Sequence, residues 1–193
     1  MSRLVFVTGA ARSGKSHHAE ALASSLAGDA PVLYVATADV GDEEMRRRVN
    51  EHRSRRPWSW ETLEARRNVA ERLGDANAIG VVLLDCLSLL VSNALLDTVE
   101  EYGDGADAEQ EASEVVRKEV EALIRHQKRH EIDLIVVSNE VGWGVVPPHR
   151  LGRIYRDLLG WANQRVAAES TEAFLLVAGI PVTLKGSGLR AGF

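Results

Sequence analysis

The chain has 193 residues, of which 45% are apolar, and it carries a formal net charge of −5 with a pI near 5.7. This size and apolar content predict one globular domain over residues 1–193, and the acidic balance argues against a general role in binding nucleic acid or an anionic membrane, because such partners favour a basic surface. The single cysteine, Cys86, cannot form an intramolecular disulfide, the N-terminus lacks a signal-like segment, and no stretch approaches the roughly 18 apolar residues of a membrane span, so we expect a cytoplasmic protein.

Short runs rich in β-branched residues alternate with helical patterns along the chain. This rhythm predicts an α/β fold with a mostly parallel sheet flanked by helices. The predicted strands cover residues 4–7, 32–36, 79–84 and 132–138. Apolar residues at helical spacing predict helices after the first strand, around residues 45–52 and over residues 151–168. Two further short runs, 173–177 and 181–184, predict an antiparallel hairpin at the C-terminal edge of the sheet.

An acidic, glycine-containing segment covers residues 97–112. It shows no clear apolar period until Val115, where the next helical pattern begins. We therefore expect the first half of this segment to be an exposed loop.

A phosphate-binding pattern, G-x-x-x-x-G-K-[ST], lies between the first predicted strand and the first predicted helix. Its eight positions are Gly9, Ala10, Ala11, Arg12, Ser13, Gly14, Lys15 and Ser16. In such a P-loop the glycines permit a tight turn, and the backbone N–H groups at the helix N-terminus face the phosphates. Lys15 is then expected to reach the β- and γ-phosphate oxygens, and Ser16 to bind Mg²⁺. The alternative is a glycine turn that only caps a helix.

Polar residues follow several predicted strands, at the edge where open α/β sheets bind ligands. Asp85 ends one apolar strand and is expected to hold Mg²⁺ directly or through water, with helix capping, for which Ser88 is also available, as the alternative. Thr37 follows another strand. Asn139 and Glu140 follow a third, where positioning an acceptor hydroxyl or Mg²⁺ competes with helix capping.

Eight arginines crowd into the 22 positions from Arg46 to Arg67 of this acidic chain. Guanidinium groups suit bidentate phosphate contacts, although a solvated helix face is the simpler alternative. His52 shares a helical stripe with Met45 and Val49. A neutral imidazole there can attack the α-phosphorus of a triphosphate, expel pyrophosphate and form a phosphoramidate. His52 is therefore our candidate nucleophile, with a structural role as the alternative.

Several spaced motifs together resemble one family, the bifunctional adenosylcobinamide kinases and adenosylcobinamide-phosphate guanylyltransferases of cobalamin biosynthesis. The motifs are the P-loop, Tyr34-Val-Ala-Thr37, His52-Arg-Ser-Arg-Arg-Pro57, Trp60-Glu-Thr-Leu-Glu64, Asn139-Glu-Val-Gly-Trp-Gly-Val-Val-Pro147 and Arg150-Leu-Gly-Arg-Ile-Tyr-Arg-Asp157. The resemblance implies a RecA-like P-loop fold, ATP and GTP as substrates, and a homotrimer. It also implies phosphorylation of adenosylcobinamide, followed by GMP transfer to adenosylcobinamide phosphate through a guanylylated His52.

The resemblance also assigns nucleotide contacts beyond the P-loop. They are Ala36, Thr37, Ala38, Arg53, Ser54, Arg55, Arg56, Glu64 and Asp85. Trp143 lies between two glycines near the expected ligand-binding edge, where contact with a corrinoid or nucleotide competes with a subunit contact.

Two other functions fit parts of the sequence. A P-loop kinase with another acceptor would carry no covalent nucleotide, and a non-catalytic RecA-like module would bind nucleotide without acceptor-dependent turnover. A regulatory GTPase is disfavoured because no N-K-x-D sequence follows a predicted strand.

Overall fold

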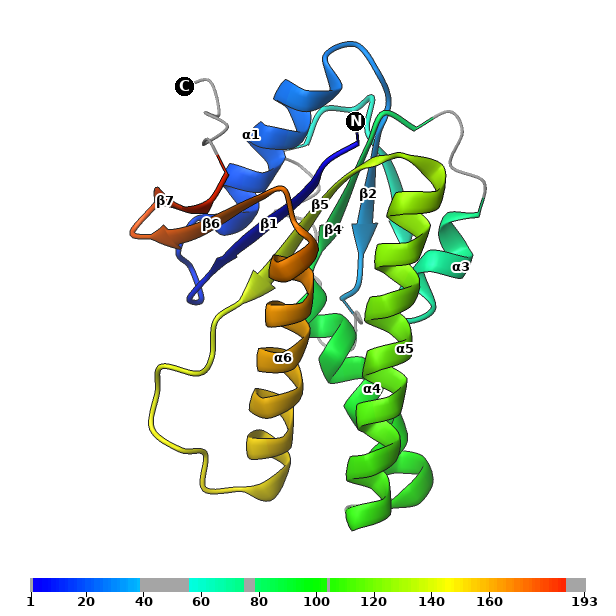
Figure 1. Cartoon of the computed structure of the whole chain (residues 1–193), viewed down its shortest axis with the longest axis vertical. Helices are drawn as coiled ribbons and strands as arrows, with labels where there is room; N and C mark the ends of the chain where they lie inside the picture. Colours follow the sequence, from blue (N-terminus) through cyan, green and yellow to red (C-terminus); the bar gives the residue numbers. More distant parts are fainter. Residues whose placement is uncertain (1, 39–55, 75–78, 104, 187–193) are drawn as a thin grey trace.

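The computed structural model describes residues 2–38, 56–74, 79–103 and 105–186. These residues form a seven-stranded sheet with the order β3-β2-β4-β5-β1-β6-β7 (Figure 1). The strands are β1 (Leu4–Gly9), β2 (Val32–Ala36), β3 (Glu61–Glu64), β4 (Val81–Asp85), β5 (Asp133–Asn139), β6 (Glu172–Val177) and β7 (Ile180–Lys185). All the neighbouring pairs are parallel except β6 and β7. The predicted parallel sheet and antiparallel edge hairpin are confirmed, whereas β3 was not predicted.

Helices cover both faces of this sheet. They are α1 (Lys15–Ala27), α3 (Val69–Leu73), α4 (Leu87–Tyr102), α5 (Ala106–His130) and α6 (Arg150–Glu169). Successive residues of a strand point to opposite faces, so Val5 and Val7 pack with the α1 layer while Phe6 packs with the layer of the other helices. The strands β1, β2, β4 and β5 are buried on both faces, and their nearly continuous runs of apolar residues agree with this position.

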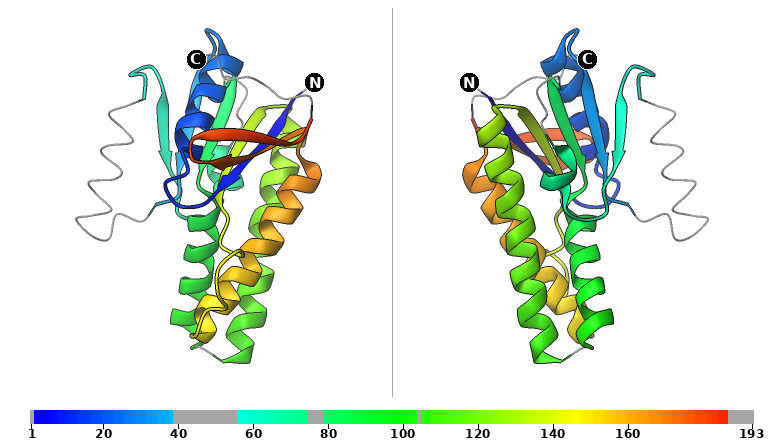
Figure 2. Two further views of the ribbon diagram at one scale, coloured as in Figure 1. Left: turned by 90° about the vertical axis from the view of Figure 1, so that its left-hand side faces the viewer. Right: turned by 90° about the vertical axis from the view of Figure 1, so that its right-hand side faces the viewer.

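The three long helices extend past the sheet as a bundle (Figure 2). Helix α4 starts next to the carboxyl end of β4 and runs away from the sheet, and α5 and α6 return toward it. The segment between β5 and α6 spans the length of this projection (Figure 1). The carboxyl edge of the sheet is therefore bordered by a helical layer and by one long connection.

The expectation of an exposed loop in the first half of residues 97–112 is wrong. Helix α4 continues to Tyr102, and α5 begins at Ala106, so most of the segment is helical. The buried positions here are small residues, such as Ala108 and Ala112, and acidic side chains face outward. Small buried residues contribute little to the spacing of apolar residues that predicts a helix. The end of α4 and the start of α5 therefore showed no helical pattern in the sequence.

A buried asparagine ties α4 to the chain that crosses the carboxyl edge. Asn93 is 5% exposed, and its Nδ2 donates to the carbonyl oxygens of Thr37, at 2.9 Å, and Arg66, at 3.0 Å. One side chain thus holds the exits of β2 and β3 against the same helix.

We predict that Asn93→Leu lowers the free energy of unfolding by about 1–3 kcal/mol, because it leaves two buried carbonyl groups without their donor. Chemical denaturation measures this loss. Gln164→Leu, on the exposed side of α6, is the control and should change stability little. Equal stability of the two variants would contradict the role given to Asn93.

Candidate nucleotide-binding site

The P-loop connects the end of β1 to the start of α1. Gly14 precedes the helix with a φ of +92°, and Ser13 N donates to Ala10 O at 3.2 Å to close a turn. The Oγ of Ser13 is buried and makes no hydrogen bond within the described part of the chain. A buried hydroxyl and the N-terminal amides of a 13-residue helix together suit an anionic ligand.

The glycines of this loop are required by close packing. A Cβ on Gly9 would lie 2.6 Å from both Leu176 O and Ser13 Oγ, and a Cβ on Gly14 would lie 3.2 Å from Gly179 Cα. The turn between β6 and β7 contacts the loop directly, since Gly179 N donates to Ser13 O at 2.9 Å. The C-terminal hairpin therefore fixes the shape of the P-loop.

Lys15 lies within the loop. Its Nζ donates to Ala10 O at 3.1 Å, and burial lowers the pKa of Lys15 below its ordinary value. The ammonium group is the only side-chain cation inside the described loop besides Arg12, which is exposed. When a nucleotide binds, Lys15 Nζ could replace its hydrogen bond to Ala10 O with one to a phosphate oxygen.

Asp85 lies two strands away from the P-loop, because β5 separates β4 from β1. Tyr34, from β2, donates its hydroxyl to Asp85 Oδ2 at 2.9 Å, and the guanidinium carbon of Arg56 lies 3.6 Å from the centre of the Tyr34 ring. Burial, and secondarily the charge of Asp85, raises the pKa of Tyr34, so the phenol remains a proton donor. The capping alternative for Asp85 is wrong, because α4 has Cys86 as its N-cap residue and no side-chain cap.

The oxygen donors at this edge fit Mg²⁺. Ser16 and Asp85 are both partly exposed, and they supply one hydroxyl and one carboxylate. No group of three or more His, Cys, Asp or Glu side chains with metal-binding geometry occurs among the described residues. Mg²⁺ commonly takes one or two protein oxygens and completes its shell with phosphates and water, so the donor set is adequate when a nucleotide is bound.

Cys86 is a buried free thiol. It is 7% exposed, and its Sγ lies 2.8 Å from Ser88 Oγ. Burial raises the pKa of Cys86 to about 11, with the Asp85 charge as a further cause. The thiol therefore stays protonated near neutral pH.

Comparisons with known proteins show the family of this chain. The family model described as cobinamide kinase / cobinamide phosphate guanyltransferase matches residues 5–184. The chain belongs to this family. The bifunctional adenosylcobalamin biosynthesis protein CobU of Escherichia coli is 40% identical over 187 residues, covering 94% of this chain and 99% of that protein. CobP of Pseudomonas aeruginosa, also described as a bifunctional adenosylcobalamin biosynthesis protein, is 42% identical over 186 residues, covering 95% of this chain and 98% of its own.

The fold is shared more widely than the family. A solved structure described as an ATPase domain superposes with a TM-score of 0.52 at 12% identity, covering 90% of this chain and 68% of that one. At this identity the likeness shows the fold alone. It agrees with the predicted P-loop NTPase architecture of this cobinamide kinase / guanyltransferase family member.

The structure gathers part of the predicted site. Ala36, at the end of β2, pairs with both Glu64 of β3 and Asp85 of β4, and Thr37 and Ala38 follow at the same edge. Arg56 joins this group through Tyr34. The remaining predicted site residues, His52, Arg53, Ser54 and Arg55, lie outside the described residues, as does the predicted helix around residues 45–52.

The connection after β5 borders the P-loop on its other side. Asn139 pairs with Gly9, and Glu140 N donates to Gly9 O at 3.0 Å. Helix capping by Asn139 or Glu140 is wrong, because the next helix starts only at Arg150. Instead, Asn139 Nδ2 donates to Ser88 Oγ at 2.9 Å, and Glu140 Oε1 accepts from Gly142 N at 2.7 Å.

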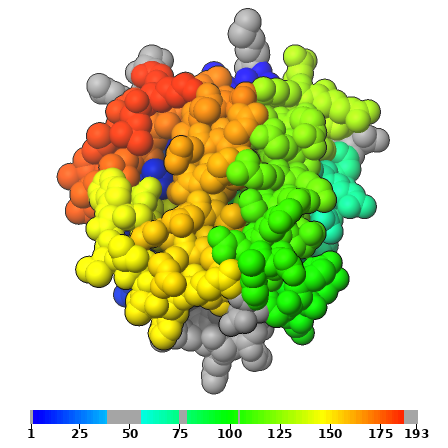
Figure 3. Space-filling view, turned by 60° about the horizontal axis from the view of Figure 1, so that its bottom comes forward, coloured from blue at the N-terminus to red at the C-terminus, as the bar shows by residue number. Residues whose placement is uncertain are grey.

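Four large apolar side chains are exposed in this connection, which we call the β5–α6 loop (residues 140–149). Their exposed fractions are 38% for Val141, 77% for Trp143, 95% for Val145 and 61% for Val146. The yellow atoms of this loop lie on the same face as the orange and red atoms of β6 and β7 (Figure 3). Val177 and Ile180, on either side of the hairpin turn, are also exposed. Apolar side chains therefore flank the P-loop on both sides.

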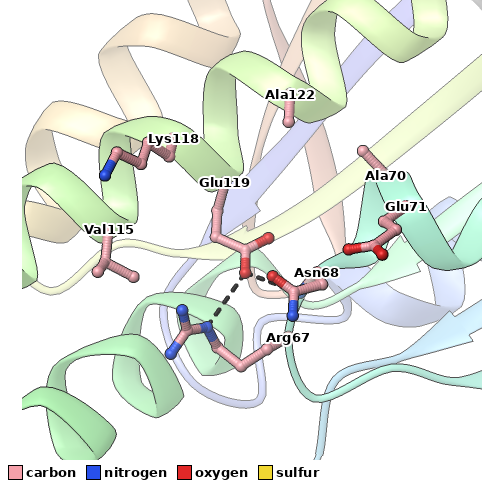
Figure 4. Close-up of a pocket in the computed structure, with 8 residues that line it drawn as sticks. All are labelled: Arg67, Asn68, Ala70, Glu71, Val115, Lys118, Glu119 and Ala122. Carbon is pink, nitrogen blue, oxygen red and sulfur yellow. Dashed lines mark hydrogen bonds and ion pairs between the residues drawn. The ribbon is translucent and has the colours of Figure 1, made fainter.

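A cavity of about 230 Å³ lies away from these residues, between α3 and α5. Glu119 points into a polar cluster there, accepting from Asn68 N at 2.7 Å and pairing with Arg67 at 3.1 Å (Figure 4). Arg67 also pairs with Asp97 of α4 at 3.0 Å. None of the predicted nucleotide-binding residues lines this cavity, so we assign the cluster to anchoring the exit of β3.

Sequence reasoning missed two contributors to this site. Tyr34 entered only as part of a family motif, and Asn93 was not noticed. Each is a polar residue within an apolar segment, at a position facing the core. A polar residue at a core-facing position could have indicated both, because a buried polar group needs a hydrogen-bond partner.

We predict that Gly9→Ala weakens nucleotide binding by about tenfold or more, because its methyl group would collide with backbone and P-loop atoms. Calorimetric titration with GDP measures the affinity. Gly105→Ala is the matched control, since a Cβ there meets no atom within 4 Å. Unchanged GDP affinity in folded Gly9→Ala protein would refute the assignment.

Proposed function

We propose that this chain is a single nucleotide-binding domain over residues 1–193 that performs two successive reactions in the cytoplasm. It phosphorylates adenosylcobinamide with ATP or GTP, and then transfers GMP from GTP to the phosphate, giving adenosylcobinamide-GDP and pyrophosphate. The observation that carries the proposal is the P-loop with Asp85 at the same sheet edge, in a chain that matches the kinase and guanyltransferase family over residues 5–184.

In the kinase step, the acceptor hydroxyl oxygen bonds to the γ-phosphorus while the bond to the β-phosphate oxygen breaks. The hydroxyl proton passes to solvent or to a nearby base, for which Glu140 is a candidate. Lys15 and the amides of the P-loop offset the charge on the β- and γ-phosphate oxygens. Ser16 and Asp85 are the residues that would hold Mg²⁺, which supplies further charge neutralisation when bound.

In the transfer step, an imidazole nitrogen of His52 bonds to the α-phosphorus of GTP, and pyrophosphate leaves. A phosphate oxygen of the acceptor then attacks the same phosphorus, and the nitrogen–phosphorus bond breaks to restore the imidazole. His52 lies outside the described residues. Support comes from Arg56, four positions later, whose guanidinium group lies on the Tyr34 ring next to Asp85, so that this arginine reaches the edge where Asp85 lies.

The acceptor is a corrinoid, a broad ring system with apolar faces. We assign its docking to the β5–α6 loop, because this loop starts beside Gly9 and exposes Trp143 and three valines. Gly142 and Gly144 flank the indole and leave its faces open. Exposed apolar groups of this density commonly mark a binding surface.

A homotrimer is part of the proposal and rests on family resemblance. The edge strand β7 offers a compatible surface, since Ile180, Val182 and Leu184 are each 45% or more exposed. Light scattering of the purified protein measures the assembly.

We predict that wild-type protein incubated with Mg²⁺ and GTP labelled at the α-phosphate retains label after denaturation, and that His52→Ala does not. The label should be acid-labile and base-stable, as a phosphoramidate is, and adenosylcobinamide phosphate should discharge it. Lys15→Ala, which impairs the hold on the triphosphate, should label weakly.

The labelling experiment separates the proposal from its rivals. A folded, GTP-binding wild type that retains no label would favour a plain P-loop kinase with His52 in a structural role. GTP binding without turnover of any corrinoid would favour a non-catalytic module.

We predict that Trp143→Ala raises the KM for adenosylcobinamide about tenfold, because it removes a large aromatic contact, while leaving guanylylation by GTP alone unchanged. Steady-state kinetics and the labelling assay measure the two effects. Tyr102→Ala, which removes an exposed ring at the far end of α4, is the control. A variant with altered assembly and unchanged KM would assign Trp143 to a subunit contact.

A further inference from the structure

Tyr34 is a tyrosine in an otherwise apolar strand, and its side chain is almost fully buried. It is 4% exposed and packs in the core layer between the sheet and α1. Its neighbours in β2 are all apolar, so packing alone does not require a hydroxyl at this position. The phenol oxygen reaches the carboxyl edge and meets Asp85 on the adjacent strand.

The hydrogen bond to Asp85 has a defined consequence for that carboxylate. Tyr34 Oη donates to Oδ2 at 2.9 Å, and this is the only side-chain hydrogen bond to Asp85 between described residues. It fixes the rotation of the carboxylate and engages one of its two oxygens. The other oxygen is left without a protein hydrogen bond in the described part of the chain.

Arg56 holds the same ring from its exposed side. Its guanidinium carbon lies 3.6 Å from the ring centroid, and its Nη1 donates to Thr62 Oγ1 of β3 at 3.3 Å. The ring thus lies between core side chains on one side and a planar cation on the other. A ring restrained in this way holds its hydroxyl in one direction.

We infer that Tyr34 is a positioning residue that orients Asp85 for Mg²⁺, and that Arg56 restrains Tyr34 by stacking on its ring. The inference rests on the proposed metal role of Asp85. Its physical basis is that a carboxylate already aligned by a hydrogen bond loses less conformational freedom when it binds a cation. The arrangement also joins the arginine-rich segment to the metal site through one aromatic ring.

Tyr34→Phe isolates the hydroxyl, because it keeps the ring, its core packing and the surface under Arg56. The experiment titrates Mg²⁺ into full-length protein with a non-hydrolysable GTP analogue and follows analogue affinity by calorimetry. We expect the Mg²⁺ concentration at half-effect to rise about tenfold in Tyr34→Phe. Analogue affinity in EDTA should stay at the wild-type value. In a separate assay with GTP and the acceptor, the kcat of the variant should recover at saturating Mg²⁺.

Tyr155→Phe is the matched control. It removes the hydroxyl of a partly buried tyrosine that donates to Ser88 O at 3.3 Å, where Tyr34 donates to Asp85. Its Mg²⁺ midpoint should equal that of the wild type. A double-mutant cycle with Asp85→Asn provides a second test, since Tyr34→Phe should add no further shift once the carboxylate is gone.

Three outcomes would overturn the inference. One is a Tyr34→Phe midpoint equal to that of the wild type. Another is an equal loss of analogue affinity with and without Mg²⁺, which a general packing defect would produce. The third is a wild type whose affinity for the analogue does not depend on Mg²⁺. Only this third result would also remove the proposed metal role of Asp85.

Discussion

The backbone pairing of β1 with β5 and β6 is the interaction on which the rest of this structure depends. Gly9, the last residue of β1, is held between Asn139 on one side and Leu176 on the other. Because all three strands run parallel, their carboxyl ends meet at one edge. The P-loop must therefore leave β1 between the β5–α6 loop and the β6–β7 turn, and both of these neighbours contact it.

A second set of contacts holds the other half of the edge. The hydroxyl of Thr37 donates to Cys86 O at 2.7 Å and accepts from Cys86 N at 2.8 Å, joining the exits of β2 and β4. Asn93 then joins the exits of β2 and β3. These polar groups hydrogen-bond across three strand exits, and such networks favour a single arrangement. The metal-binding candidate Asp85 is thus carried on a fixed frame.

The sequence predicted the parallel sheet, the edge hairpin and the P-loop, because β-branched runs and glycine spacing are local signals. It did not predict β3, whose residues Glu61–Glu64 are mostly exposed and lack an apolar run. It also took the end of α4 and the start of α5 for a loop, since the buried residues there, Thr98, Ala108 and Ala112, are small. The bond between Tyr34 and Asp85 links residues 51 positions apart, and no local pattern encodes such a pairing. The roles of His52 to Arg55 stay predictions.

The dependence of the P-loop on the last hairpin bears on how the protein is made. The nucleotide loop occupies residues 9–16, yet its shape is fixed by a turn at residues 178–179, far along the chain. Its strand is also enclosed by β5 and β6, both of which come much later in the sequence. A chain emerging from the ribosome can therefore complete the contacts that shape this early loop only after the last hairpin has been synthesised.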